Sequence, residues 1–144
     1  MIARMETGPT IAAISSAVGG AARMIVRISG VRALSIAAAL GAQFTGGGGA
    51  TLSVVWPGVR VWVYCFRRGR SYTGEDLIEF HIPGNLVLAR MLLDEVIARG
   101  ARLAEAGEFT ARAYFNGRMD LTQAEGVAAT IAAQSERELR AARQ

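Results

Sequence analysis

Two charged side chains stand in runs of sequence that otherwise favour buried β-strands. Arg27 is flanked by Val and Ile, and Glu79 is flanked by Ile and Phe. Because strand side chains alternate between two faces, Glu79 shares a face with Leu77 and His81. A charge on a buried sheet face is costly unless it is paired or hydrogen-bonded. Each residue therefore needs a partner: an ion pair between the two across the sheet, solvent, or a bound ligand.

Two further stretches gather polar side chains, and several kinds of chemistry are excluded. The stretches are the turn at 71–76, which leads into Glu79, and a helix–turn–helix region at 107–125. All sixteen cations are arginines, so a P-loop, which needs a lysine on the terminal phosphates, is absent. One histidine and one cysteine are too few for a convincing transition-metal site. We therefore predict no metal and no catalytic residue.

The patterning of the chain predicts the elements that must position these residues. Strands are predicted over 10–15, 23–28, 51–56, 59–66, 76–82 and, more briefly, 101–104, with helices over 31–40, 86–99, 110–116 and from 122 onward. Several of the strands are joined as sequential hairpins. The 144 residues thus predict one α+β domain with a mixed or antiparallel sheet and helices on one face.

Local signals predict where the helices begin. Ser29 and Asn85 are predicted N-caps of the helices that follow them. Thr122 and Glu125 have the spacing of a capping box that opens the last helix. No apolar run is long enough to cross a bilayer and no secretory signal is visible, so we expect a cytoplasmic location and no membrane partner.

Four stretches of the chain together resemble one protein family. Ser71-Tyr-Thr-Gly-Glu-Asp-Leu-Ile-Glu-Phe-His81 and the Gly107–Glu125 run Gly-Glu-Phe-Thr-Ala-Arg-Ala-Tyr-Phe-Asn-Gly-Arg-Met-Asp-Leu-Thr-Gln-Ala-Glu resemble its two signature motifs, and 10–14 and 25–30 resemble its opening hairpin. The family is that of the tRNA-modification GTPases MnmE, also called TrmE, and the resemblance is to its N-terminal domain. It covers nearly the whole chain from Thr10 onward.

This resemblance implies a fold, a ligand and partners. The family's domain resembles half of the folate-binding domain of aminomethyltransferases and is completed by homodimerisation. The implied cofactor is a one-carbon tetrahydrofolate such as 5-formyltetrahydrofolate. The implied partners are a second copy, a flavin-containing MnmG-type protein and tRNA, whose wobble uridine is modified at C5. Residues 1–120 would form the folate-binding domain, and 121–144 would begin the helical domain.

Position by position, the resemblance places three cofactor-binding residues. They are Arg27, Glu79 and Arg118, the last standing where the family has a lysine. A carboxylate can accept two hydrogen bonds from the amino-pyrimidone edge of a pterin, and arginines suit carbonyl and carboxylate groups. The family's GTPase domain has no counterpart here, so the resemblance implies no GTP hydrolysis by these residues.

Departures from the family keep other functions open. The loop at 17–22 lacks the family's arginine, and the run after His81 reads Ile-Pro-Gly-Asn in place of a Gly-His-Gly-Gly run. One alternative is therefore a dimerisation or scaffold module with a degenerate folate pocket. Another, suggested by the net charge of +4 and by Arg67, Arg68 and Arg70, is a basic nucleic-acid module.

Overall fold

A computed structural model describes residues 8–16, 23–45 and 48–142. The strands in these ranges are β1 (Ile11–Ser16), β2 (Arg23–Ser29), β3 (Gly49–Val55), β4 (Val59–Phe66), β5 (Leu77–Pro83) and β6 (Arg102–Leu103). The helices are α1 (Ala33–Ala39), α2 (Leu86–Ala98), α3 (Glu108–Phe115) and α4 (Leu121–Ala142). Each predicted strand and helix has a counterpart, and the α+β class is confirmed.

The strands form one mixed sheet in the order β3-β4-β5-β2-β1-β6. Both predicted hairpins, β1–β2 and β3–β4, are antiparallel pairs, whereas β6 runs parallel to β1. β2 and β5 are neighbours in the middle of the sheet although a long stretch of chain separates them. Their register sets Arg27 directly opposite Glu79.

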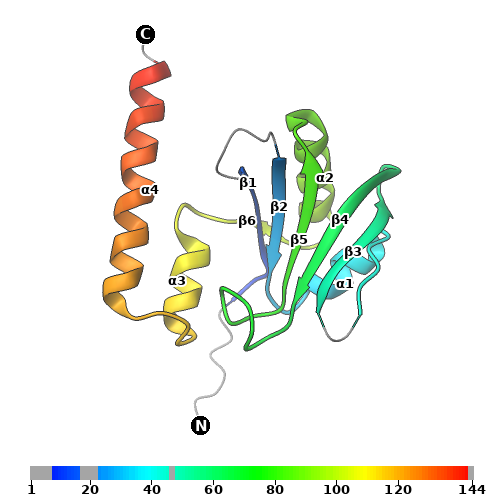
Figure 1. Cartoon of the computed structure of the whole chain (residues 1–144), viewed down its shortest axis with the longest axis horizontal. Coiled ribbons are helices and arrows are strands. Elements are labelled where there is room, and N and C mark those ends of the chain that lie inside the picture. Colours follow the sequence, from blue (N-terminus) through cyan, green and yellow to red (C-terminus); the bar gives the residue numbers. More distant parts are fainter. Residues whose placement is uncertain (1–7, 17–22, 46–47, 143–144) are drawn as a thin grey trace.

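The two faces of the sheet differ in what covers them. One face carries fully buried side chains such as Val26, Ile28 and Phe80, which form a core with α1 and α2. Because side chains alternate, Arg27 and Glu79 lie on the opposite face. We call this opposite face the open face. Figure 1 shows α2 behind the sheet and the α3–α4 pair to one side, with α4 farther from the strands.

One of the predicted helix caps is confirmed and two are wrong. Asn85 caps α2, since its side-chain oxygen accepts a hydrogen bond from the Leu88 amide at 3.0 Å. Ser29 does not cap α1, because it belongs to β2 and its hydroxyl is used by Thr73 and Glu75. Arg32 stands at the N-cap of α1 and makes no side-chain capping bond.

The capping box of α4 lies two residues before the predicted one. The Asp120 carboxylate accepts from the Gln123 amide at 2.7 Å, and the Gln123 side chain accepts from the Asp120 amide at 2.9 Å. An Asp and a Gln can make the same reciprocal bonds as Thr122 and Glu125, and the chain uses the earlier pair. No helix in the described ranges is long and apolar enough to span a membrane.

Candidate functional site

The two charged strand residues form an ion pair on the open face. The Nε and Nη2 atoms of Arg27 each lie 2.8 Å from Oε2 of Glu79. The side chain of Arg27 is 27% exposed and that of Glu79 is 14% exposed. Of the partners that the sequence left open, the cross-sheet ion pair is therefore present, and it keeps contact with solvent.

His81 joins this pair from the same strand as Glu79. Its Nε2 lies 2.9 Å from Oε1 of Glu79, and its Nδ1 lies 3.3 Å from Nη1 of Arg23. A guanidinium can only donate, so Nδ1 is the acceptor and the network assigns the ring proton to Nε2, which donates to Glu79. Oε2 of Glu79 is contacted by two nitrogens of Arg27, whereas Oε1 has His81 as its partner and room for a further hydrogen bond. We call Arg23, Arg27, Glu79 and His81 the charged cluster.

Aromatic rings border the charged cluster on two sides. The Tyr64 ring lies 4.2 Å from the His81 ring between centroids, and Phe66 stacks on Tyr64 at 6.4 Å. The Phe109 ring, from α3, lies 5.6 Å from the guanidinium carbon of Arg27. Flat rings beside a carboxylate and two guanidinium groups suit a flat, polar heteroaromatic ligand, which can stack and hydrogen-bond at once.

Arg118, the third residue that the resemblance placed in the site, lies apart from this pair in its hydrogen bonds. Its Nη1 donates to the carbonyl oxygen of Gly69 at 3.0 Å, in the turn before β5. Within the described ranges, no hydrogen bond or ion pair joins it to Arg27 or Glu79. The structure therefore brings two of the three predicted residues together through direct contacts.

Sequence reasoning missed a second, more deeply buried cluster. Arg112 of α3 is 4% exposed and pairs with Glu75, with Nη1 at 3.1 Å from Oε1. The sequence marked the stretches that hold them only as polar, a helix–turn–helix region at 107–125 and a turn at 71–76. One signal could have found Arg112: like Arg27, it stands between apolar residues, here two alanines.

Three ionisable groups in the described ranges have pKa values moved by their surroundings, one of them Arg102, whose pKa is raised by its hydrogen bond to Glu108. A hydrogen bond from Arg102, more than any other contact, lowers the pKa of the Glu108 carboxyl below its ordinary value. Burial raises the pKa of the Cys65 thiol, which lies on the core face. Within the part of the chain that the structure describes, no group of three His, Cys, Asp or Glu could hold a metal ion.

The basic turn of the nucleic-acid alternative is exposed and partly neutralised. Arg67 lies 3.3 Å from the Asp76 carboxylate, which also accepts from the Arg68 amide at 2.8 Å. Arg70 is exposed in the same turn. This geometry is that of a solvated surface whose charge Asp76 partly neutralises.

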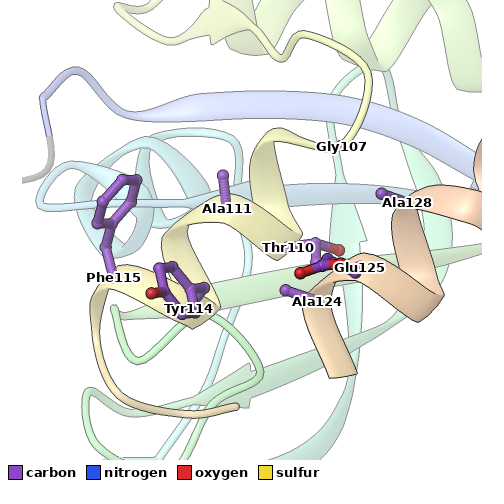
Figure 2. Close-up of a pocket in the computed structure, with 8 residues that line it drawn as sticks. All are labelled: Gly107, Thr110, Ala111, Tyr114, Phe115, Ala124, Glu125 and Ala128. Atoms are coloured by element: carbon purple, nitrogen blue, oxygen red, sulfur yellow. The ribbon is translucent and has the colours of Figure 1, made fainter. Parts of the chain in front are cut away.

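An apolar groove lies between α3 and α4 (Figure 2). It has a volume of about 230 Å³. Its lining residues are Gly107, Thr110, Ala111, Tyr114, Phe115, Ala124, Glu125 and Ala128. None of the three predicted site residues is among them.

Of the two loops that depart from the family, 17–22 lies outside the described residues, and the run after His81 ends in the Asn85 cap of α2.

Fold and site together define a small α+β domain whose mixed sheet presents a charged, ring-bordered cluster on its open face. Residues 10–118 match the family model described as the GTP-binding protein TrmE N-terminus. Since this match covers most of the chain, the chain belongs to that family.

Individual relatives agree with this assignment. The chain is 44% identical over 137 residues to the tRNA modification GTPase MnmE of Caulobacter vibrioides, which covers 92% of this chain and 31% of that protein. It is 44% identical to the protein of the same name from Thermus thermophilus over 141 residues, covering 88% of this chain and 31% of the relative. The chain thus spans about a third of the length of the curated relatives it matches.

Proposed function

We propose that this chain binds a one-carbon tetrahydrofolate, such as 5-formyltetrahydrofolate, at the charged cluster. The observation that carries the proposal is the Glu79 carboxylate, which is 14% exposed on the open face. It can accept hydrogen bonds from the amino-pyrimidone edge of the pterin, while Tyr64 offers a ring to stack against. Arg27 and Arg118 suit the carbonyl and carboxylate groups of the ligand, and within the described ranges Arg118 uses one of its five N–H groups, on the Gly69 carbonyl.

We also propose that a second copy of the chain covers the open face and completes the pocket. On β3 and β4 this face exposes four large apolar side chains: Leu52 at 41%, Val54 at 60%, Trp62 at 48% and Phe66 at 36%. Trp62 stands opposite His81 in the sheet register, so the apolar patch adjoins the charged cluster. A contiguous exposed apolar patch beside a polar site is typical of an interaction surface, and identical patches can pair about a two-fold axis.

The proposed setting is a tRNA-modification system in the cytoplasm. The relatives are tRNA modification GTPases, and this chain spans about a third of their length. In this setting the dimer supplies a folate-bound carbon for C5 of the wobble uridine, acting with tRNA and a flavin-containing MnmG-type protein. GTP hydrolysis and the chemical step are assigned to residues outside this chain.

Calorimetric titration of the chain with 5-formyltetrahydrofolate tests the ligand. We expect saturable binding near one ligand per chain. Glu79→Ala should lower the affinity by roughly a hundredfold, because charge-assisted hydrogen bonds to the ligand are lost. Glu136→Ala is the matched control, since Glu136 pairs with an arginine but is 63% exposed on α4. Unchanged affinity in a folded Glu79→Ala variant would reject the proposed site.

One observation favours the rival scaffold function. Both carboxylate oxygens of Glu79 already have protein partners, as they would in a sheet that no longer binds a ligand. Light scattering separates the two ideas when combined with the titration. A stable dimer that gives no heat and no thermal shift with the folate would establish the scaffold and remove the folate proposal. Replacement of Trp62 by Ser should convert either dimer to a monomer.

A further inference from the structure

Arg112 is the most deeply buried of the ion-paired arginines in the described ranges, and its guanidinium ties three segments together. Nη1 contacts both carboxylate oxygens of Glu75, at 3.1 and 3.3 Å. Nη2 donates to the carbonyl oxygen of Pro9 at 2.6 Å, just ahead of β1. Nη2 also lies 3.4 Å from Glu108, one turn earlier in α3. The Arg112 guanidinium therefore joins α3 to the turn before β5 and to the segment before β1.

Glu75 carries this connection on to the strand that holds Arg27. The hydroxyl of Ser29 donates to Oε1 of Glu75 at 2.8 Å and lies 2.7 Å from the Thr73 hydroxyl. Ser29 and Arg27 are two residues apart in β2, so their side chains emerge on the same face. We call Arg112, Glu75 and Ser29 the clasp.

A second contact closes the path between α3 and β2. Phe109 stands three residues before Arg112, so both side chains point from one side of the helix. The Phe109 ring lies 5.6 Å from the guanidinium carbon of Arg27. The path therefore runs from Arg27 through Phe109 and α3 to the clasp and back along β2. Two anchors on one helix side fix both the rotation of α3 and its distance from the sheet.

We infer that Arg112 is a positioning residue for the ligand site: through the clasp it sets α3 so that Phe109 holds the Arg27 guanidinium against Glu79. The inference rests on the proposed folate function for its ligand, but the arrangement itself exists without one. A buried ion pair is weak evidence for stability, because well-packed apolar side chains often replace it without loss. A planar fork with fixed donors does specify orientation, which an apolar contact does not.

A double-mutant cycle in ligand affinity tests this role. The variants are Arg112→Met, Phe109→Leu and the combination, each titrated with 5-formyltetrahydrofolate well below its unfolding temperature. We expect each single variant to weaken binding about tenfold, the size of one charge-assisted contact. The double variant should bind the ligand only slightly more weakly than either single variant, because Arg112 and Phe109 both act by positioning the Arg27 guanidinium. Losses that multiply in full, or unchanged affinity in folded Arg112→Met, would overturn the inference.

A ligand-free measurement keeps this inference separate from the folate proposal. His81 is the sole histidine, so its imidazole NMR signals are unambiguous, and it contacts Glu79 directly. Arg112→Met and Phe109→Leu should shift these signals in the same direction. Unmoved signals in both variants would refute the positioning role even if the folate binds. If the wild-type chain binds no folate but the signals shift, only the folate proposal fails.

Two further variants complete the design. Arg140→Met removes a guanidinium from an Arg–Glu pair that is 74% and 63% exposed on α4, and it should change neither affinity nor the His81 signals. Ser29→Ala removes the hydroxyl that donates to Glu75 in the clasp. This variant is used in place of Arg112→Met if Arg112→Met does not fold. It should move the His81 signals in the same direction by a smaller amount. A folded Ser29→Ala variant with wild-type signals would count against the clasp.

Discussion

The charged cluster and the clasp are both built on an arginine–glutamate pair, and both tie β2 to a neighbour. They differ in what surrounds the guanidinium. Arg27 is 27% exposed and rests against an aromatic ring, whereas Arg112 is 4% exposed and all its contacts are internal. A guanidinium that keeps contact with solvent can exchange partners with a ligand at low cost, and one enclosed by fixed acceptors cannot. The same pair of residue types therefore suits binding in one place and positioning in the other.

The largest expected difference between the two regions is in stability. Arg112→Met removes a guanidinium that is 4% exposed and takes a donor away from Glu75, Glu108 and the Pro9 carbonyl, so we expect the free energy of unfolding to fall by about 3–5 kcal/mol. Arg27→Met leaves Glu79 with His81 and access to water, and the loss should be nearer 1 kcal/mol. Urea denaturation of the two variants gives both values. Equal losses would show that the difference in exposure does not separate the two pairs.

A pair of glycines in one turn sharpens the comparison at the backbone level. Gly74 has a φ of 82°, and a Cβ there would lie 2.7 Å from Cβ of Asn116, beyond the end of α3. Gly69 has a φ of 86° and open space around the same position. Both alanine variants should carry the strain of a left-handed residue, about 1 kcal/mol.

Only Gly74→Ala should also push the turn that holds Glu75 away from the end of α3. We expect it to lower the free energy of unfolding by about 2–3 kcal/mol in total, since overpacking adds to the strain. Gly69→Ala, measured by the same urea titration, is its control. A Gly74→Ala variant as stable as Gly69→Ala would mean that the turn yields freely and that its contact with α3 does not hold it.

Much of this architecture could be predicted from the sequence, because local signals carry it. Alternating apolar residues gave the strands, and Asn85 marked the start of α2. The charges at Arg27 and Glu79 were visible because they interrupt apolar runs. The strand order could not be derived, since the β2–β5 pairing joins residues about fifty positions apart.

The clasp shows why some contacts could not be predicted from the sequence. Ser29 had a good local explanation as a helix cap, but in the fold Thr73 and Glu75 lie close enough to use its hydroxyl. The burial of Arg112 likewise depends on where Glu75 and the Pro9 carbonyl arrive in three dimensions. A side chain with several possible local roles takes the one that tertiary contacts complete.

A hydrogen bond at the edge of the clasp should have a smaller effect. The Tyr72 hydroxyl lies 2.8 Å from the hydroxyl of Thr110, which is 7% exposed on α3. Tyr72→Phe should therefore lower the free energy of unfolding by about 1 kcal/mol. Tyr114→Phe is the matched control, because Tyr114 is 38% exposed, close to the 43% of Tyr72, and its ring meets Phe115 edge-on. A loss of the same size in both variants would contradict the assigned bond.

The smallest expected effect depends on pH and concerns Glu108, at the rim of the clasp. Its pKa is lowered in the folded chain, chiefly by the hydrogen bond from Arg102, so the unfolded chain takes up a proton first on acidification. The contribution of Glu108 to stability is therefore complete above its ordinary pKa and is lost as the pH falls through the lower, folded value. Relative to Glu108→Gln, the wild type should be more stable by about a few tenths of a kcal/mol at neutral pH, the size of a solvent-screened pair. That margin should vanish in urea titrations carried out at strongly acidic pH. If the stability of the wild type relative to Glu108→Gln instead grew on acidification, the Arg102 contact could not be its cause.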